Sequence, residues 1–415
     1  MLSGGGRQDD LTQHKQKNSN QNKAKKEKND EFYTQYEDIE KEVNAYIDFN
    51  KDVFRDKVIL CPCDDPDKSN FTKYFAQNFK RLGIKKLIST SYAKNSKSFP
   101  HDLLESCIEK DSPLYDIMKT DIKGKIFTLE GDTNKDGSVN MFDLEFKGYL
   151  EGDGDFRSEE VRKLRDEADI IITNPPFSLF REFVDWIMET NKQFLIIGNM
   201  NAITYKECFK YIKDNQMWCG TKSFSGGMDM VMPKDTFDET KIKSYEIDDR
   251  GYIIKNIMGV IYFTNLEHNK RHQPMHFMTM EENLKHNKKD LPNGYEKYDN
   301  YDAIEVPKVS LIPSDYDGVM GVPITYLGNH NPEEFEILGA TQRECHELVP
   351  DIKKYDDYKE ILNSTNEKTG ASGGKTNENA NLIGRGQGKT FFRNSEGREI
   401  YSCYQRLFIK KRNKK

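Results

Sequence analysis

The first half of the chain alternates between helical and strand patterns of apolar residues. Apolar residues recur at three- and four-residue steps over 30–46 and 71–82, which is the spacing of one buried helix face. Short apolar runs at 57–61 and 85–90 are typical of buried strands, and Gly83 ends the helix between them. The order strand, helix, strand predicts an α/β fold with a parallel sheet.

The same pattern returns after an interruption. Residues 93–150 are polar and turn-rich, and we expect them to form an insertion that contains a β-hairpin. A charged helix is predicted at 158–167, and an Ile-rich strand at 169–173. A helix at 178–190 and a strand at 194–198 complete the repeating part of the chain.

The second half of the chain lacks this rhythm. From about residue 220 to 345, short strands, aromatic residues and turn signals dominate, so we predict a domain at 30–220 and a separate region at 221–415. Within that region, residues 363–390 are rich in Asn, Gly, Thr and Ser, which predicts a mobile loop. Residues 1–29 are rich in Gln, Asn and Lys, which predicts a disordered tail.

Charge gathers at the two ends of the chain. The formal net charge is -6, yet residues 1–30 hold seven Lys and Arg against four Asp and Glu, and residues 385–415 hold ten against two. Basic ends of this kind can reach a phosphate backbone. A solvated basic tail is the plain alternative for residues 410–415.

The composition excludes several classes of protein. No apolar run approaches the roughly 18 residues that cross a bilayer, and the polar N-terminus is not a secretory signal. The seven cysteines are an odd number, and no second pair stands at zinc-finger spacing beside Cys61 and Cys63. We therefore expect reduced thiols, no metal centre and a cytoplasmic location.

The most informative stretch follows the Ile-rich strand and reads Asn174-Pro175-Pro176-Phe177. The prolines stop the strand and restrict the residue before them, which holds Asn174 and the Pro175 carbonyl at the strand's carboxyl end. Ligands of open α/β sheets bind at that end. Two acceptors beside an aromatic face suit a planar ring with an exocyclic amino group. A strand end followed by a proline turn is the purely structural alternative.

This tetrapeptide resembles the catalytic motif of amino-group methyltransferases that use S-adenosylmethionine. Similar tetrapeptides occur in enzymes that methylate protein glutamine or rRNA guanine, so the motif specifies the chemistry better than the substrate. Further segments are similar to the EcoRI-type family of adenine methyltransferases, from about residue 29 to 335. They are Phe32–Tyr36, Cys63–Pro66, Phe75-Ala76, Lys85–Ile88, Gly152–Ser158, Asn174–Arg181, Ile203–Glu207, Tyr298–Ile304 and Gly318–Thr325.

The resemblance implies a function and a fold. It implies a monomeric, metal-free enzyme that transfers a methyl group from S-adenosylmethionine to N6 of an adenine flipped out of double-stranded DNA. It also implies a Rossmann-like class I methyltransferase sheet over 30–220 and a C-terminal target-recognition region over 221–415. A cognate restriction endonuclease is a candidate partner, and a bacterial, plasmid or phage context is expected. Enzymes acting on RNA or protein glutamine, and an inactive DNA-binding relative, are the alternatives.

The resemblance also assigns residues to the cofactor near the first predicted strand. Tyr33 and Thr34 stand where such enzymes contact the methionine carboxylate, although an ordinary helix start explains them too. Asp64, Asp65 and Pro66 follow the strand, where the family places an acidic residue and a proline. The glycines usual at that point are missing here, which weakens the match.

The last cofactor residues lie in a Gly-Asp-Gly-Asp-Phe stretch. Asp155 is expected to accept from the adenine amino group of the cofactor and Phe156 to stack on its ring, with a surface turn as the alternative. The end of the second strand, at 89–92, offers no acid for the ribose. A separate signal at 132–143 fits the spacing of a calcium loop, but the flanks are strand-like and Asp136-Gly137 favours a hairpin turn.

Overall fold

The chain forms two compact units in a computed structural model. The structure describes residues 33–66, 69–93, 107–232, 245–248, 251–341 and 353–412. The first unit spans residues 1–199 and 225–266, and the second spans 200–224 and 267–415. The expected tail at 1–29 lies outside the described residues. No helix of the described part is long and apolar enough to cross a membrane.

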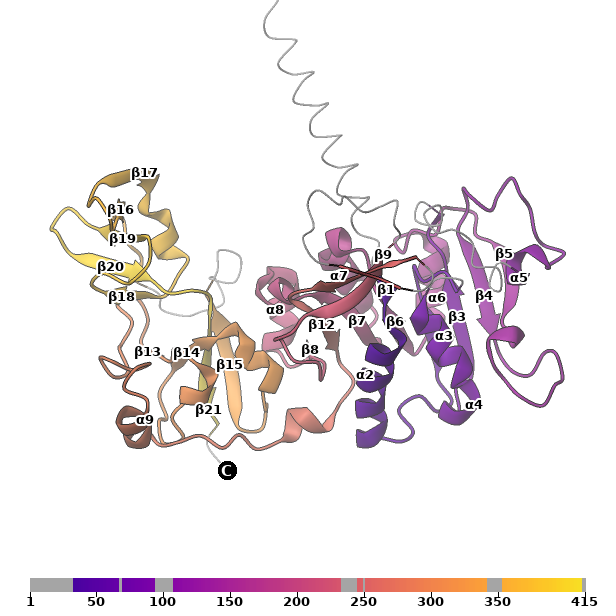
Figure 1. The fold of residues 1–415 in the computed structure, drawn as a ribbon, viewed down its shortest axis with the longest axis horizontal. Coiled ribbons are helices and arrows are strands. Elements are labelled where there is room, and N and C mark those ends of the chain that lie inside the picture. The colour runs from indigo at the N-terminus through magenta and orange to yellow at the C-terminus, as the bar shows by residue number, and fades with distance from the viewer. Residues whose placement is uncertain are drawn as a thin grey trace, which may run out of the picture. The chain divides into compact units, whose positions relative to one another are not determined.

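The first unit is built on a mixed sheet with the order β5-β4-β3-β2-β6-β7-β12 (Figure 1). Four neighbouring strands, β3, β2, β6 and β7, run parallel, and β5, β4 and β12 extend the sheet with antiparallel pairs. The strands are β2 (Val58–Cys61), β3 (Lys86–Thr90), β4 (Lys125–Leu129), β5 (Glu145–Tyr149), β6 (Ile170–Thr173), β7 (Gln193–Asn199) and β12 (Val260–Thr264).

Helices cover both faces of this sheet. Apolar residues of α2, α3 and α4 share one core cluster with alternate strand residues such as Ile197 and Tyr262. Phe180 of α7 packs against Gly198 and Phe263, which belong to the opposite face. The helices are α2 (Tyr36–Phe49), α3 (Asn70–Gln77), α4 (Phe79–Leu82), α5 (Cys107–Lys110), α6 (Glu159–Glu167) and α7 (Phe180–Met188).

Several predicted elements are found close to their predicted positions. The helix predicted over 71–82 is divided at Asn78 into α3 and α4, and Gly83 ends α4 with a left-handed φ of 65°. An antiparallel pair, β4 and β5, lies in the segment 93–150 where a hairpin is predicted. The helix predicted over 178–190 begins with a 3-10 turn, η3 (Phe177–Leu179).

A second, antiparallel sheet in the first unit corrects the prediction for the start of the 30–46 helix. Tyr33 and Thr34 form strand β1 and pair with Val231 and Met230, so the helix begins only at Tyr36. The amphipathic pattern could not show this, because the partner strand lies far along the chain. The sheet has the order β1-β9-β11-β10, with β1 (Tyr33–Thr34), β9 (Met228–Met232), β10 (Glu246–Ile247) and β11 (Ile253–Ile257).

These strands explain why the division between the units differs from the predicted boundary at residue 220. Strands β9 and β11 pair with each other and with β1, and β12 pairs with β7. Segment 225–266 therefore belongs to the first unit, whereas 200–224 belongs to the second. In the second unit 200–224 contains η4 (Met200–Thr204), α8 (Lys206–Lys213) and β8 (Trp218–Cys219).

The rest of the second unit contains a sheet with the order β13-β14-β21-β15. Its strands are β13 (Ile304–Glu305), β14 (Met320–Pro323), β15 (Phe335–Ala340) and β21 (Arg406–Lys411). The short helices of this unit are η6 (Asn269–His272), α9 (Met280–His286), η7 (Val309–Leu311) and η8 (Ile324–Asn329).

Strand β21 corrects the prediction of a basic C-terminal tail for residues 410 and 411, while residues 413–415 of that tail lie outside the described residues. It lies between β14 and β15, and Leu407, Phe408 and Ile409 are buried. Lys411 donates to the Ser314 carbonyl at 2.5 Å, so its charge is held against the fold. The sequence Arg-Leu-Phe-Ile-Lys-Lys conceals a central strand, because its apolar run is only three residues long and basic residues flank it on both sides.

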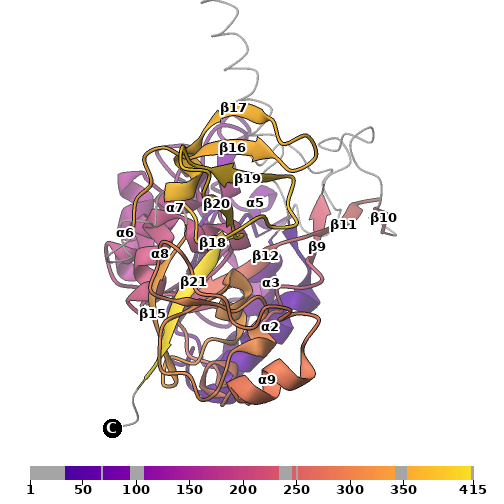
Figure 2. The ribbon, with the colours of Figure 1, turned by 90° about the vertical axis from the view of Figure 1, so that its left-hand side faces the viewer.

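An insert between β15 and β21 corrects the prediction of a mobile loop at 363–390. It forms a sheet of its own with the order β17-β16-β19-β20-β18 (Figure 2). Its few apolar residues are buried on both faces, with Ile361 opposite Phe391 on one face and Phe392 opposite Ile400 on the other. The elements are β16 (Lys359–Leu362), β17 (Lys368–Ser372), η10 (Gly373–Asn377), β18 (Asn381–Ile383), β19 (Thr390–Arg393) and β20 (Glu399–Ser402).

Candidate active site

The candidate site lies where the neighbouring parallel strands β2 and β6 end. Their register places Leu60 opposite Ile171, so the residues that follow each strand emerge at one edge of the sheet. The Thr173 hydroxyl donates to the Pro62 carbonyl at 2.5 Å and ties the two strand ends together. This contact brings the Asn174 segment and the Asp64 segment to the same place.

The tetrapeptide after β6 forms a fixed corner. Pro175 is buried, whereas Asn174 and Pro176 are partly exposed. Pro176 is extended, with φ -55° and ψ 122°, and caps the 3-10 turn that begins at Phe177. Phe177 is half-buried and packs against the apolar core of the first unit. An aromatic ring, an amide and a buried proline carbonyl are thus presented beside one another at a strand end.

Asp64 is an unusual carboxyl group on the other side of this edge. It is buried, and its Oδ2 atom has no hydrogen-bond partner within the described residues. Burial raises the pKa of Asp64 to about 7, against an opposing effect of the Thr173 and Ser69 hydroxyls. Cys63 turns the chain just before it with a left-handed φ of 62°. A buried acceptor of this kind is suited to a cationic or amino ligand.

The N-terminus of α3 gathers the two cofactor segments nearest to the first strand. Ser69 accepts from the Phe71 N–H at 3.1 Å, and its own N–H donates to the Asp65 carbonyl at 2.7 Å. Asn70 Nδ2 donates to the Thr34 carbonyl at 2.7 Å. Strand β1 and the loop after β2 are therefore both attached to this helix end, where the helix dipole favours an anion.

Thr34, Asp65 and Pro66 are all buried at this helix end, and Tyr33 is partly exposed. The Thr34 Oγ1 atom is buried and has no hydrogen-bond partner in the described part of the chain. An unsatisfied hydroxyl and an unsatisfied carboxylate oxygen, Asp64 Oδ2, thus stand at the same helix end. Both fit the polar end of a bound amino acid.

The Asp155 segment approaches the site from the end of β3. The Ala93 N–H donates to the Asp153 carbonyl at 2.8 Å. Gly154 has a φ of 87°, and a Cβ at this position would collide with the Ser91 carbonyl, so the close approach requires glycine. These contacts attach the segment that carries Asp153 and Asp155 to the end of β3, which is the neighbour of β2 in the sheet. The structure thus brings together all three predicted cofactor segments.

Phe156 differs from its predicted role. Its side chain is only 2% exposed, and its ring meets Phe183 and Trp186 edge to face at centroid distances of 4.9 and 5.6 Å. Such burial leaves no open face on which another ring could stack. Asp155 is also engaged, because Arg157 forms an ion pair with it at 2.6 Å.

Sequence reasoning missed the polar residues that join these segments. Ser89 donates to the Asp64 carbonyl and lies 2.9 Å from the Thr72 hydroxyl, and both are buried. Thr173 and Asn70 act in the same way. The Ser69-Asn70 pair carries a helix-cap signal, but nothing in its sequence indicates that Asn70 reaches strand β1.

The loop at 132–143 turns its carboxylates toward its own backbone. Asp143 is buried and accepts from the N–H groups of Thr133 and Asn140 at 2.9 and 3.0 Å. Asp132 accepts from the Gly137 N–H at 2.9 Å. Within the described residues, no group of three or more His, Cys, Asp or Glu is arranged to hold a metal ion. The structure therefore presents this segment as the turn between β4 and β5.

Comparison with known proteins gave consistent matches. A family model described as the adenine-specific methyltransferase EcoRI matches residues 20–412. The chain is similar to the type II methyltransferase M.EcoRI of Escherichia coli, with 43% identity over 76% of this chain and 87% of that protein. It is also similar to M.MgeORF184P of Mycoplasma genitalium and M.MpnI of Mycoplasma pneumoniae. The identities are 36% and 35%, each over 76% of this chain and 84% of the relative. No solved structure matches the chain.

Proposed function

The chain belongs to the EcoRI family of adenine-specific methyltransferases, and on this premise we propose that it methylates N6 of an adenine flipped out of duplex DNA, with S-adenosylmethionine as the methyl donor. Its activity as an adenine-specific DNA methyltransferase follows from the family and its type II relatives. The observation that carries the proposed mechanism is the placement of Asn174–Phe177 beside the buried Asp64 at one sheet edge.

The catalytic residues position and polarise the target amine. The Asn174 side-chain oxygen and the Pro175 carbonyl each accept a hydrogen bond from the N6 amino group, which directs the nitrogen lone pair out of the ring system toward the methyl donor. Pro176 fixes the backbone between them and Phe177. Stacking of the flipped base on Phe177 offsets about 1–3 kcal/mol of the free energy that flipping costs. S-adenosylmethionine supplies a methyl group already activated by its sulfonium. Positioning and electrostatics are then sufficient, and no strong base is required.

The residues around α3 fit the methionine end of this cofactor. The buried Asp64 carboxylate can accept from its amino group, and the Thr34 hydroxyl and the N-terminus of α3 can receive its carboxylate. We assign Tyr33 to the same end of the cofactor, beside Thr34. Asp65 and Pro66 shape the turn that follows β2. Because both buried oxygens lack partners in the described residues, a ligand there would satisfy them.

The adenine end of the cofactor is assigned to the Asp155 segment with one change. Asp155 accepts from the adenine amino group while it also holds Arg157, since a carboxylate has four acceptor positions. The buried Phe156 ring anchors this segment against Phe183 and Trp186, so its contribution is to position Asp155.

The two units divide the task. We assign a Rossmann-like class I methyltransferase sheet to the first unit and target recognition to the second. The parallel order β3-β2-β6-β7 supports the first assignment, because the strand order reverses beside β2 and the site lies there. We further propose a monomer in the bacterial cytoplasm, carried with a plasmid or phage and paired with a restriction endonuclease.

Incubation with tritiated S-adenosylmethionine tests the proposed function. The protein is offered duplex DNA, RNA and a cell protein extract in separate reactions, and the labelled product is identified by chromatography. We expect the label in N6-methyladenine of duplex DNA. Label in RNA or in protein glutamine would replace the proposal with another substrate class, and no transfer at all would identify an inactive DNA-binding relative.

A further inference from the structure

The second unit contains a polar pocket of approximately 780 Å³ beside the insert. Strands β19 and β20 and the loop at 384–389 form one side, and residues around β13 and the start of β21 form the other. Tyr401 and Phe392 are among its lining residues, together with the carboxylates of Asp290, Glu296, Glu305 and Glu360. The pocket thus combines aromatic rings with long polar side chains.

The loop at 384–389 is held in place at both ends and in the middle. Asn363 Nδ2 donates to the Gly386 carbonyl at 3.0 Å and to the Gly388 carbonyl at 2.6 Å. A Cβ on Gly386 would collide with the Tyr401 ring, so this glycine permits the close approach. Arg385 forms a two-bond ion pair with Glu399, at 2.6 and 2.7 Å. The residue between the two clamped carbonyls is therefore presented on a rigid support.

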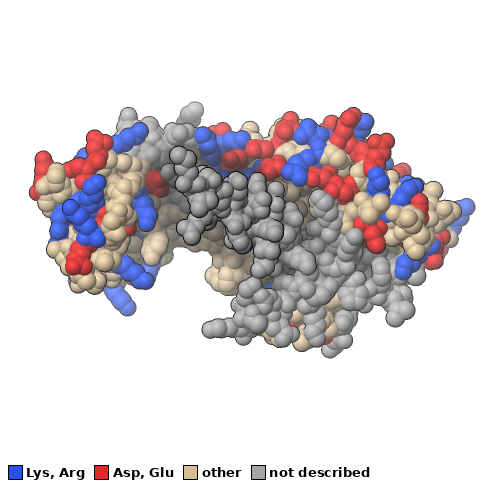
Figure 3. All heavy atoms as spheres, turned by 90° about the horizontal axis from the view of Figure 1, so that it is seen from above, with Lys and Arg blue, Asp and Glu red and all other residues tan. Residues whose placement is uncertain are grey.

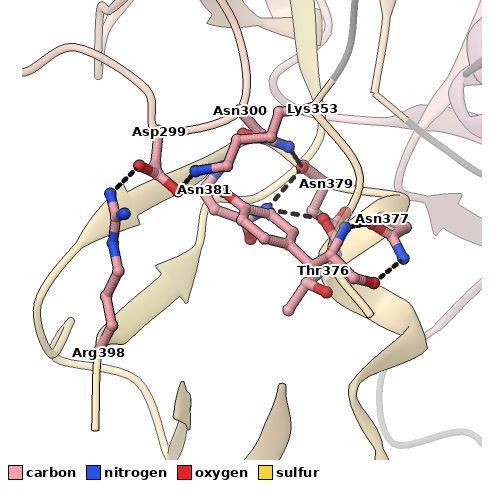
Figure 4. A network of polar contacts seen from close by, with 9 residues as sticks. Asp299, Asn300, Lys353, Thr376, Asn377, Asn379, Asn381 and Arg398 are labelled. Atoms are coloured by element: carbon pink, nitrogen blue, oxygen red, sulfur yellow. Dashed lines mark hydrogen bonds and ion pairs between the residues drawn. The ribbon is translucent and has the colours of Figure 1, made fainter. Parts of the chain in front are cut away.

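The insert that carries the loop is itself attached to the rest of the unit by polar contacts (Figure 4). Asp299 forms an ion pair with Arg398 and accepts from the Tyr355 hydroxyl at 2.6 Å. Asn300 accepts from the Asn381 N–H at 2.9 Å. The pKa of Asp299 is lowered overall. Burial acts in the raising direction, but the hydrogen bond from Tyr355 and the nearby basic side chains outweigh the effect of burial. Asp299 is therefore ionised at neutral pH and holds the insert.

The side chains that enter the pocket from this loop have no partner in the described chain. Gln387 and Lys389 are exposed, and their polar side-chain atoms make no hydrogen bond or ion pair within the described residues. Gln405, another lining residue, is partly exposed, and its side chain likewise makes no hydrogen bond within the described residues. Tyr404 beside it is 90% exposed. Polar side chains that lack protein partners and stand on a rigid backbone are typical of a recognition site.

We propose that Gln387 reads a non-target adenine in the major groove of the substrate, by a pair of hydrogen bonds to N6 and N7. This inference rests on the proposed function, since it takes duplex DNA as the substrate. A carboxamide carries one acceptor and one donor in the plane that matches the adenine edge. The clamp by Asn363 on both flanking carbonyls fixes the direction of Gln387.

The charge around the pocket favours base reading over a phosphate-binding surface. Residues of both signs are interspersed on the described surface (Figure 3), and the lining of the pocket likewise combines the cations Lys375, Lys389 and Arg406 with four carboxylates. Arg385, Arg393 and Arg398 are each paired with a carboxylate, whereas Lys389 forms no ion pair within the described residues. We assign Lys389, two residues from Gln387, to a phosphate next to the base that is read.

Substrates with 7-deazaadenine, which lacks the N7 acceptor, test this contact. The methylated sites are first identified by sequencing DNA treated with the full-length protein, and each non-target adenine of the site is then replaced in turn. We expect one replacement to lower kcat/KM of the unaltered protein by about tenfold to a hundredfold. The Gln387→Ala variant should show no such penalty, and it should accept other bases at that position.

Two control variants make the result specific. Gln216→Ala removes an exposed glutamine of the same unit that does not line the pocket, and it should retain the penalty of the unaltered protein. Lys389→Ala should weaken binding of every sequence equally and reduce the slope of log affinity against log salt by roughly one unit. The base preference of Lys389→Ala should be unchanged.

The outcomes separate this inference from the function on which it rests. If the unaltered protein methylates no adenine in duplex DNA, the proposed function fails before Gln387 is tested. If it does so and Gln387→Ala keeps every base preference, the assignment of Gln387 is overturned. The assignment is also overturned if Gln387→Ala slows all sequences equally, because that result would describe a structural or phosphate contact.

Discussion

At the scale of single residues, the site depends on polar groups that the fold buries before any ligand arrives. Asp64 and Thr34 each hold an unsatisfied oxygen within the described residues. Burying such groups costs free energy, so the rest of the first unit must stabilise this arrangement. The consequence for binding is preorganisation, because the ligand meets hydrogen-bonding groups that do not have to move.

The role of Asn174 is tested by Asn174→Ala. Without the side-chain oxygen, the target amine loses one of its two acceptors, and kcat should fall by about a hundredfold to a thousandfold. DNA affinity and thermal stability should remain close to those of the unaltered protein. Asn44→Ala, at a half-buried position on α2, is the matched control and should keep full activity. Equal rates for Asn174→Ala and the unaltered protein would remove Asn174 from the mechanism.

The raised pKa of Asp64 predicts a pH dependence of stability. The folded pKa of about 7 lies above that of an unfolded aspartate, so the protonated form favours folding. This contribution is fully present below about pH 4 and is lost as the pH rises through 7. Relative to Asp64→Asn, the cofactor-free protein should therefore lose unfolding free energy over that interval, by at most roughly 1.4 kcal/mol per pH unit. Denaturant titrations at several pH values measure it, and parallel curves would contradict it.

The position of the motif Asn174 to Phe177 at a strand end was predictable from the sequence, since prolines after an apolar strand fix the backbone whatever surrounds them. The catalytic roles of these residues stay a prediction. The stacking role given to Phe156 could not be checked in sequence, because a ring's exposure depends on Phe183 and Trp186 from another helix. The linking residues Asn70 and Ser89 were not predictable, since their partners are distant along the chain.

At the scale of elements, α3 joins parts that the sequence separates widely. Its first turn holds strand β1 through Asn70 and the loop after β2 through Ser69. Strand β1 has only two residues, so its pairing with β9 alone gives little stability. The position of Thr34 therefore depends on the side chain of Asn70.

Asn70→Ala should raise the dissociation constant of the cofactor without lowering kcat at saturation. Loss of one hydrogen bond costs about 0.5–1.5 kcal/mol, which corresponds to roughly a twofold to tenfold weaker affinity. Asn78→Ala is the matched control, because Asn78 Nδ2 donates to the Tyr74 carbonyl at 2.9 Å at the other end of the same helix. Calorimetric titration of both variants checks the prediction. Equal losses of affinity would mean that α3 is merely destabilised as a whole.

Elements with a strong period were predictable, and those defined by distant pairing were not. The helices and strands from α3 to β7 follow from apolar spacing within short windows. Strand β1 does not, because its partner β9 lies far along the chain. In the sheet at 359–402, β16 pairs with β17 and β19 with β20 as near neighbours, but β16 also pairs with β19, and β18 with β20, across intervening strands. Asn- and Gly-rich composition predicts a loop at 363–390, yet here Asn363 and Asn381 bond to backbone groups and support the sheet.

At the scale of the whole molecule, the second unit depends on its last described strand. Strand β21 pairs with β14 on one side and β15 on the other. Leu407, Phe408 and Ile409 are each at most 1% exposed. Burial of three such side chains contributes about 5–9 kcal/mol, which is comparable to the entire stability of a typical domain.

Removal of residues 406–415 should therefore unfold the sheet of the second unit, whereas removal of 413–415 should not. Hydrogen exchange followed by mass spectrometry reports the two units separately. We expect fast exchange in β14 and β15 of the longer truncation and unchanged protection in β2 and β6. Retained protection of β14 and β15 would show that β21 is dispensable, as a solvated basic tail would be.

The place of β21 also sets an order of events on the ribosome. Every strand of the first unit has been translated before the insert begins, whereas the strand that closes β14 against β15 emerges only after the insert. Since domains fold as units during translation, the nascent chain completes the first unit before the second. Under the roles proposed for the two units, a newly made enzyme thus acquires the means to carry a methyl group before it can choose where on duplex DNA to place it.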